Sequence, residues 1–288
     1  MILVVLALAI WLGLWWLNQR LVAIETGVNK TKARVINLFV PLLFGVTIFA
    51  LWELLVRGLE VSPVLLPPPS AIWARIISSL PILWADFQQT ILKAVLAGYI
   101  MGCLSGFLVA LAIDRSPFLQ RGLLPLGNFV SALPIIGVAP IMVMWFGFDW
   151  QSKAAVVVIM TFFPMLVNTV QGLAVASTME RDLMKTYAGS WWQTLVKLRL
   201  PAAAPFIFNA LKINSTLALI GAIVAEFFGT PIVGMGFRIS TEVGRMNVDM
   251  VRAEIAVAAL AGSAFYGGVA LIERAVTFWH PSVRSGRI

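Results

Sequence analysis

The sequence alternates between long apolar runs and short polar stretches. A helix needs about 20 apolar residues to cross the hydrocarbon core of a bilayer, and six runs meet that length. These runs are Asn37–Val56, Ile91–Ile113, Leu123–Phe148, Ala154–Ala174, Phe206–Phe228 and Ala253–Ala275. A seventh run, Ile2–Leu17, is shorter. It has no basic residue before it and no small-residue cleavage site after it, so we expect an uncleaved helix rather than a signal peptide.

The composition supports an all-α polytopic membrane protein. Of 288 residues, 60% are hydrophobic and 12% charged, and the mean hydropathy is +0.93, which leaves too few polar residues to cover a water-facing surface. Cys103 and His280 are the only residues of their types, which excludes internal disulfides, cysteine metal clusters and most histidine chemistry. A membrane-embedded enzyme is therefore the least favoured class, and we expect neither catalytic residues nor a metal site.

Basic residues predict the orientation. With the stretch after Leu17 in the cytoplasm, thirteen of the 21 Lys and Arg residues fall on the cytoplasmic side and seven on the opposite side. Lys212 lies inside a span, near enough to its end for the ammonium group to reach the cytoplasmic surface. Topology and contact with anionic lipid thus explain the net charge of +8, and no nucleic acid partner is expected.

The stretch Ser177–Pro205 is too polar to lie in lipid and falls on the predicted cytoplasmic side. Ser177 with Glu180, and Ser190 with Gln193, have the spacing of capping boxes, in which a serine and a Glu or Gln three residues later satisfy each other's backbone N–H groups. The boxes predict two short helices, over 178–187 and 191–200. A loop that folds without a function is the alternative, although loops of this length are usually functional.

Two residues are expected to end these short helices. Gly189 is expected to end the first helix in the left-handed conformation, and Pro201 to end the second by disfavouring helical geometry at Leu200. Four apolar side chains are available to pack: Leu183, Tyr187, Leu195 and Leu198. Four basic side chains are expected to be exposed: Arg181, Lys185, Lys197 and Arg199.

Between the first two full-length runs lies the segment Leu65–Trp84, with three consecutive prolines near its start. Prolines cannot continue a helix, so the chain must turn there. The part after Ser70 is amphipathic, and we expect it to lie along the outer interface with Trp73 and Trp84 as anchors.

Within the runs, small and polar residues suggest packing and a pathway. Gly98, Gly102 and Gly106 recur every four residues, which favours close helix packing. Prolines and polar groups inside spans can line a cavity, although interhelical hydrogen bonding explains most such residues, and Glu226 could equally be a cap or ion-pair partner. The pathway candidates are Ser131, Pro134, Pro140, Asn168, Gln171, Asn214 and Glu226.

The segment GSWWQTLVKLRLPAAAP resembles the second half of the signature loop of binding-protein-dependent ABC importer permeases, whose pattern is roughly E-A-A-x3-G-x9-I-x-L-P. Aligned through Leu200 and Pro201, the family's acidic residue falls on Asp182 and its alanines on Leu183 and Met184. Its glycine falls on Ala188, so the front half departs from the pattern and the glycine is expected one position later, at Gly189.

The resemblance extends from about Leu65 to Trp279. The blocks LLPPPSAIW, ALPIIGVAPIMVMWFGF, FFPMLVNTVQGL, IVAEFFG and GMGFRI are similar in content and order to the nitrate, sulfonate and taurine branch of those permeases. The resemblance implies a type I ABC importer transmembrane fold in a bacterial inner membrane, with six core spans over residues 36–288, a coupling loop at 177–205, and an extra N-terminal helix and linker over residues 1–35.

In that family the loop couples each permease to a separate cytoplasmic ATPase. This chain contains no G-x4-G-K-[ST] motif, so the resemblance implies that a partner ATPase binds ATP and magnesium and that this subunit has no cofactor and no catalysis. The further partners implied are an extracytoplasmic solute-binding protein, a second permease copy and membrane lipid. The implied coupling residues are Asp182, Leu183, Met184, Ala188, Gly189, Ser190, Trp192, Leu200 and Pro201.

The branch is similar to importers of nitrate, sulfonates and taurine, which favours a small anion as the solute. Pyrimidine-type precursors of thiamine or other vitamin-like solutes are the alternative within the same architecture. A stand-alone channel or secondary transporter is a different class and usually requires intramembrane ionisable groups. Glu53, Lys212 and Glu226 are the main such groups here, and all lie toward span ends.

Overall fold

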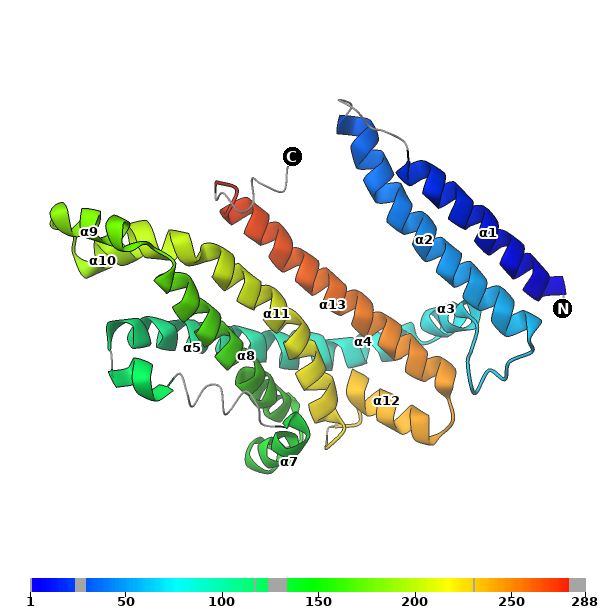
Figure 1. Cartoon of the computed structure of the whole chain (residues 1–288). Coiled ribbons are helices and arrows are strands. Elements are labelled where there is room, and N and C mark those ends of the chain that lie inside the picture. Colours follow the sequence, from blue (N-terminus) through cyan, green and yellow to red (C-terminus); the bar gives the residue numbers. More distant parts are fainter. Residues whose placement is uncertain (1, 24–29, 117, 124–133, 230, 280–288) are drawn as a thin grey trace. The chain divides into compact units, whose positions relative to one another are not determined.

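The computed structural model describes residues 2–23, 30–116, 118–123, 134–229 and 231–279 (Figure 1). Every regular element in these residues is helical, which confirms the predicted fold class. The chain divides into two compact units, Met1–Leu80 with Thr241–Ala253, and Pro81–Ser240 with Glu254–Ile288.

The first unit contains an N-terminal pair of helices, α1 (Ile2–Val22) and α2 (Lys30–Gly58), which lie side by side (Figure 1). At 21 residues, α1 is longer than the apolar run that predicted it and long enough to cross a membrane. The two helices lie close together at Gly58, where an added Cβ would lie 3.0 Å from side-chain atoms of Leu3 and Val4. Most other side chains of the pair are exposed and apolar, as lipid-facing helices require.

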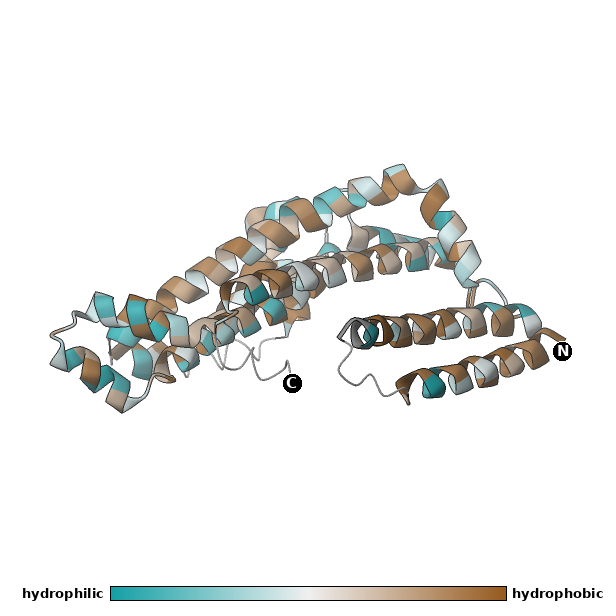
Figure 2. Cartoon of the chain, turned by 90° about the horizontal axis from the view of Figure 1, so that it is seen from above, coloured by the Kyte–Doolittle hydropathy of each residue, from teal (hydrophilic) through white to brown (hydrophobic). Residues whose placement is uncertain are grey.

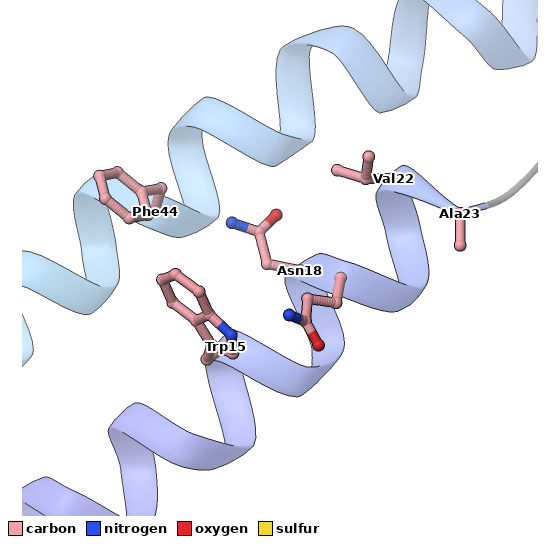
Figure 3. A pocket seen from close by; sticks show the side chains of 6 residues that line it. Trp15, Asn18, Val22, Ala23 and Phe44 are labelled. Carbon is pink, nitrogen blue, oxygen red and sulfur yellow. The ribbon is translucent and has the colours of Figure 1, made fainter.

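A cavity of about 370 Å³ lies between α1 and α2 (Figure 3). Trp15 and Asn18 of α1 point toward Phe44 of α2 across it. The lining is mostly apolar, with the side-chain amides of Asn18 and Gln19 as its polar groups.

The amphipathic segment after the prolines is helix α3, Pro69–Ser78. Glu53 of α2 holds its start, since its carboxylate accepts hydrogen bonds from the Ser70 N–H (3.0 Å) and from Ser70 Oγ (2.7 Å). Trp73 is exposed on this helix, as an interfacial anchor must be. Helix α3 ends at Ser78, and Trp84, which is also exposed, belongs to the next helix, α4 (Leu80–Phe87), so the two tryptophans lie on different helices. Their placement at the outer interface stays a prediction.

The second unit begins with one long helix built from α4, the π-helical segment η1 (Gln88–Val95) and α5 (Leu96–Arg115). Together they form a 36-residue candidate span, Leu80–Arg115. The predicted span began only at Ile91, because the polar residues at 85–90 interrupt the apolar run. The structure places several of them inside protein rather than in lipid, which is why the helix can start earlier.

The remaining helices follow in order along the chain. They are α7 (Ile135–Phe146), α8 (Trp150–Ala174), α9 (Thr178–Thr186), α10 (Trp191–Thr194), the π segment η2 (Leu195–Arg199), α11 (Leu200–Glu226), α12 (Met235–Gly244) and α13 (Val248–Val276). Among the described residues, six helical stretches are long and apolar enough to cross a membrane, including α1. Of the predicted span Leu123–Phe148, the structure describes the short helix α7, and residues 124–133 lie outside the described part.

Helices α5, α8 and α11 form the core of the second unit. The stripe Gly98, Gly102 and Gly106 faces α8, and a Cβ added at Gly98 would lie 2.5 Å from the Cβ of Val157. Added Cβ atoms at the other two glycines would also clash with α8. The predicted role of this stripe in close helix packing is therefore confirmed.

The stripe leads to a stability prediction. Gly98→Ala inserts a methyl group where α8 backbone and Val157 already lie, so we expect the protein to lose about 1–3 kcal/mol of stability. Gly267→Ala in α13 is the matched control, because an added Cβ there meets nothing within 4 Å. Thermal unfolding of both variants in detergent measures the difference. Equal midpoints would contradict the assigned packing.

Candidate functional site

The polar stretch Ser177–Pro205 folds as its capping signals predict. Ser177 Oγ accepts a hydrogen bond from the Glu180 N–H (3.2 Å), while a Glu180 carboxylate oxygen accepts one from the Ser177 N–H (2.8 Å). Ser190 and Gln193 exchange the same two bonds, at 3.2 Å and 2.8 Å. Both capping boxes are confirmed, and each begins a short helix.

The first capping box also changes the pKa of the Glu180 carboxyl. The hydrogen bond from the Ser177 N–H holds the pKa of the Glu180 carboxyl below its usual value. A lowered pKa means that this bond's contribution is present above the usual value and is lost as the pH falls through the lowered one. The cap of α9 is therefore intact at neutral pH.

The turn after α9 corrects the prediction for Gly189. The left-handed residue is Ala188, with φ of 51°, whereas the φ of Gly189 is not positive. The Ala188 N–H donates to the Lys185 carbonyl and the Gly189 N–H to the Met184 carbonyl, both at 2.8 Å, which is the Schellman arrangement at a helix end. Gly189 is needed for space instead, because a Cβ there would lie 2.8 Å from the Met184 oxygen.

This turn predicts a stabilising substitution. Ala188→Gly relieves the steric cost of a left-handed alanine, about 1–2 kcal/mol, and we expect a net gain of about 1 kcal/mol after the greater chain entropy of glycine is subtracted. The matched change is Gly189→Ala, which we expect to destabilise the same turn. Protection of the α9 amides from hydrogen exchange should rise in the first variant and fall in the second. The opposite order would show that the left-handed position is misassigned.

The second short helix does not end at Pro201, contrary to the prediction. Helix α10, η2 and α11 form a continuous helical stretch of 36 residues, Trp191–Glu226. The Leu200 N–H reaches back five residues to the Leu195 carbonyl, as in a π-helix. Pro201 lies in the first turn of α11, just after this change in hydrogen-bond pattern, where its missing N–H is tolerated.

Arg199, which the sequence predicted to be exposed, is largely buried. Its Nη1 and Nη2 donate to the two carboxylate oxygens of Asp114 at 2.7 Å and 2.6 Å. Nε and Nη2 also donate to the Leu173 carbonyl at the end of α8, each at 3.0 Å. The sequence pattern around Arg199 could not predict this ion pair, because Asp114 is 85 residues away in the sequence.

Near this ion pair, Leu195 is buried against Leu173 and Ala203, which confirms that Leu195 packs. The Arg115 guanidinium lies over the Trp191 ring, 5.2 Å from its centroid. Asp114 and Arg115 form the last turn of α5, so this helix contacts the polar stretch through two neighbouring residues.

Helix α9 presents an apolar stripe to solvent. Met179, Leu183 and Tyr187 recur every four residues and are all exposed, Tyr187 by 78%. The expectation that Leu183 and Tyr187 pack within the chain is wrong. No residue of α9 is buried, because this helix extends beyond the helical core that α5, α8 and α11 form. Figure 2 shows the hydrophilic residues gathered around α9 and α10, at the left.

The other predicted coupling residues lie around the same turn. Asp182 is exposed and pairs with Lys185 at 3.0 Å, and Trp192 is exposed beside the Trp191 ring. Met184, Gly189, Leu200 and Pro201 are half-buried, and Ala188 and Ser190 are exposed. The stretch therefore combines a continuous helical connection to α11 with a surface that is exposed among the residues that the structure describes.

The pathway candidates are scattered rather than gathered in one cavity. Ser131 lies outside the described residues, Pro134 precedes α7, and Pro140 lies inside it. Gln171 is exposed, and the half-buried Asn168 donates to the Pro164 carbonyl of its own helix. Asn214 is fully buried and donates to the Thr161 carbonyl (2.8 Å) and to Cys103 Sγ (3.2 Å), which joins α11 to α8 and α5.

Glu226, at the end of α11, belongs to a buried polar cluster. Its carboxylate accepts hydrogen bonds from Thr90 Oγ1 and from the Gly236 N–H, both at 2.7 Å. Thr90 Oγ1 in turn accepts a bond from the Met235 N–H (2.8 Å). These contacts fasten the GMGFRI block to the long first helix of the second unit, which is the capping role kept open for Glu226 in the sequence.

The same cluster contains an ion pair that the sequence did not reveal. Asp86 is fully buried and accepts hydrogen bonds from the Gly234 N–H (2.6 Å) and from Arg238 Nε (2.8 Å). Glu254 of α13 faces Asp86 and Arg238 and is also fully buried. The sequence pattern offered little indication of this cluster, because each charged residue lies at the edge of an apolar run and its partner is distant in the sequence.

Two lysines counted from the sequence as surface or snorkelling groups are paired instead. The fully buried Lys153 donates to the carbonyls of Phe148 and Gly229. Lys212 forms an ion pair with Glu273 of α13 at 2.7 Å. Both pairings leave fewer ionisable groups available inside the spans for ion coupling.

Comparison with known proteins decides the family. A family model described as the binding-protein-dependent transport system inner membrane component matches residues 94–285, well over half of the chain. The chain belongs to this family. This permease is accordingly a multi-pass inner membrane subunit of an ABC import system, and the resemblance noted in the sequence is confirmed.

Relatives of known name agree with this assignment. A probable ABC transporter permease protein of Haemophilus influenzae is 31% identical over 220 residues, which covers 76% of this permease and 89% of the relative. The formylaminopyrimidine transport permease protein ThiX of Halalkalibacterium halodurans is 30% identical over 239 residues, covering 83% and 95%. An aliphatic sulfonates transport permease protein, SsuC, of Bacillus subtilis is 28% identical over 244 residues, covering 84% and 87%.

Proposed function

We propose that this permease moves a small anion of the sulfonate, taurine or nitrate type into the cytoplasm, by alternating access driven by a separate ATPase. Relatives named for aliphatic sulfonates, taurine and bicarbonate transport support an anionic solute. A pyrimidine-type thiamine precursor is the second candidate, because the relative named for formylaminopyrimidine transport is 30% identical over most of both chains.

The observation that carries the coupling part of the proposal is the exposed stripe of α9 beside a helix that continues into a span. An ATPase subunit that binds ATP and magnesium would dock on Met179, Leu183 and Tyr187, together with Trp192. Movement of α10 would pass directly into α11, because the helix between them is unbroken. The subunit itself is then non-catalytic, and two copies of it would enclose the pathway.

In this proposal the turn residues hold the docking surface in shape. Asp182 and Leu183 are exposed on α9 and Met184 is half-buried beside them, and Ala188, Gly189 and Ser190 orient α10 relative to this helix. Leu200 and Pro201 lie where the loop enters the membrane. Pro134, Pro140, Asn168 and Gln171 stay proposed contacts of the pathway, whereas the contacts of Asn214 and Glu226 favour a structural role in the described conformation.

The test is transport by the assembled system. We expect the permease to co-purify with an ATPase of distinct sequence, and the complex in lipid vesicles to hydrolyse ATP faster when its solute-binding protein carries ligand. Uptake of radiolabelled taurine or an alkanesulfonate would support the anion, and uptake of a formylaminopyrimidine would support the second candidate. Solute uptake by the purified chain without any ATPase would overturn both in favour of a stand-alone transporter.

A further inference from the structure

The coupling loop is joined covalently to only two of the three core spans. Helix α8 leads into α9, and α10 continues through η2 into α11. Helix α5 ends at Arg115, far from the loop in sequence, so any movement of the loop reaches α5 only through non-covalent contacts. One such contact is the ion pair between Arg199 and Asp114, which is 2.6 Å long.

We propose that Arg199 is a positioning residue for energy coupling, which holds α5, α8 and the loop together so that the three core spans move as one body. This inference rests on the proposed coupling function of the loop. Arg199 binds Asp114 of α5 through two parallel hydrogen bonds and binds the Leu173 carbonyl of α8 through two more.

The geometry suits arginine and no other residue. A guanidinium presents its N–H groups in a planar fork that matches both oxygens of a carboxylate, whereas a lysine ammonium is a single point of charge. The Leu173 carbonyl is among the last four of α8, which have no partner within the helix, so Arg199 also caps α8. The side chains of Arg199 and Asp114 are only 13% and 12% exposed, and such partly buried pairs are screened much less than surface pairs.

The π segment η2 places Arg199 at this position. A π turn inserts one residue relative to an α-helix and so rotates the residues that precede it. Leu195, at the start of η2, is buried in the core, and Arg199, at its end, reaches α5 and α8. The buried Leu195 and the ion-paired Arg199 thus lie within the same five residues, where the loop continues into the span.

A pair that only stabilises the fold would behave differently from one that positions the spans for coupling. A stabilising role predicts that loss of the pair lowers the amount of folded complex, while each complex still moves the same solute per ATP. A positioning role predicts that ATP hydrolysis becomes disconnected from transport. The number of solute molecules moved per ATP hydrolysed distinguishes the two, and it is independent of how much complex survives purification.

The experiment uses the complete complex in lipid vesicles, with the permease, its ATPase and its ligand-loaded binding protein. For Asp114→Asn we expect the ATPase to co-purify, and solute moved per ATP to fall by about tenfold, within the range of measured coupling between sites. For Arg199→Lys, which keeps the charge but not the fork, we expect a smaller fall. The exchanged pair Asp114→Arg with Arg199→Asp should recover part of the loss. Arg121→Gln, an exposed basic residue on the same predicted side, should leave the ratio unchanged.

Two outcomes would overturn the inference. The first is a normal ratio of solute to ATP in Asp114→Asn, even if the yield of complex falls. The second is wild-type coupling in Arg199→Lys, because the planar fork would then be dispensable; this variant also serves if Asp114→Asn does not fold. Failure of the proposed function is distinguishable, since the unaltered complex would then show no ligand-stimulated ATP hydrolysis at all.

Discussion

Arg238→Met is expected to lower the free energy of unfolding by about 3–5 kcal/mol, because it removes one partner of a buried ion pair. Asp86 is fully buried and would lose the guanidinium that donates to its carboxylate, while it keeps the hydrogen bond from the Gly234 N–H. Glu254 faces the same guanidinium, so the substitution leaves two buried carboxyl groups without their common cation. Thermal unfolding in detergent should show a midpoint lower by on the order of 10 °C.

The chain offers a matched control for this prediction. Arg75 and Asp249 also form an Arg–Asp pair, but at 3.5 Å and with both side chains about one-third exposed. Exposed pairs contribute about 0–1 kcal/mol, so Arg75→Met should change the midpoint by only a few degrees. Similar losses in the two variants would contradict the view that burial, rather than the presence of an ion pair, makes Arg238 important.

The second large effect is expected at the α9 stripe. Leu183→Asp places a charge in the centre of the apolar surface formed with Met179 and Tyr187, so we expect ATPase binding to weaken by at least about 30-fold, which corresponds to a hot-spot residue. The amount of ATPase that co-purifies with the tagged permease measures this. Membrane insertion and thermal stability should be unchanged, because no residue of α9 is buried in the chain.

Ile232→Asp is the control for the α9 stripe. Ile232 is 80% exposed and lies in the connection between α11 and α12, on the side predicted to be opposite the ATPase. The same change of leucine-sized side chain to carboxylate should leave ATPase binding intact there. A wild-type yield of ATPase with Leu183→Asp would show that the partner does not contact this stripe.

The hydrophobic pattern was sufficient for the fold class and for most of the spans. Crossing a bilayer requires a length of apolar helix, and that requirement is visible in consecutive residues without knowledge of any partner. It failed before Ile91, where the span begins earlier than predicted because protein, rather than lipid, surrounds the polar residues Gln89 and Thr90. The expectation that Pro201 ends a helix also failed, because a π segment precedes the proline and the helix continues past it.

The capping boxes show the same principle at the candidate site. Ser177 with Glu180 and Ser190 with Gln193 are each three residues apart, so the residue types and their spacing determine the hydrogen bonds. The left-handed residue of the following turn was missed by one position. Glycine is the usual choice there, but the hydrogen bonds of the helix end select position 188, and alanine accepts the steric cost.

The sequence by itself therefore determined the membrane class, the helical spans, the two capped helices and the family motif, because each depends on residues close together in the chain. Only the tertiary structure decided which charges are buried and paired. Arg199 and Asp114 are 85 residues apart, and Arg238 and Asp86 are 152 apart. Such contacts depend on how α5 packs against η2 and how α4 packs against α12, and neighbouring residues in the sequence do not indicate which distant charge will become the partner.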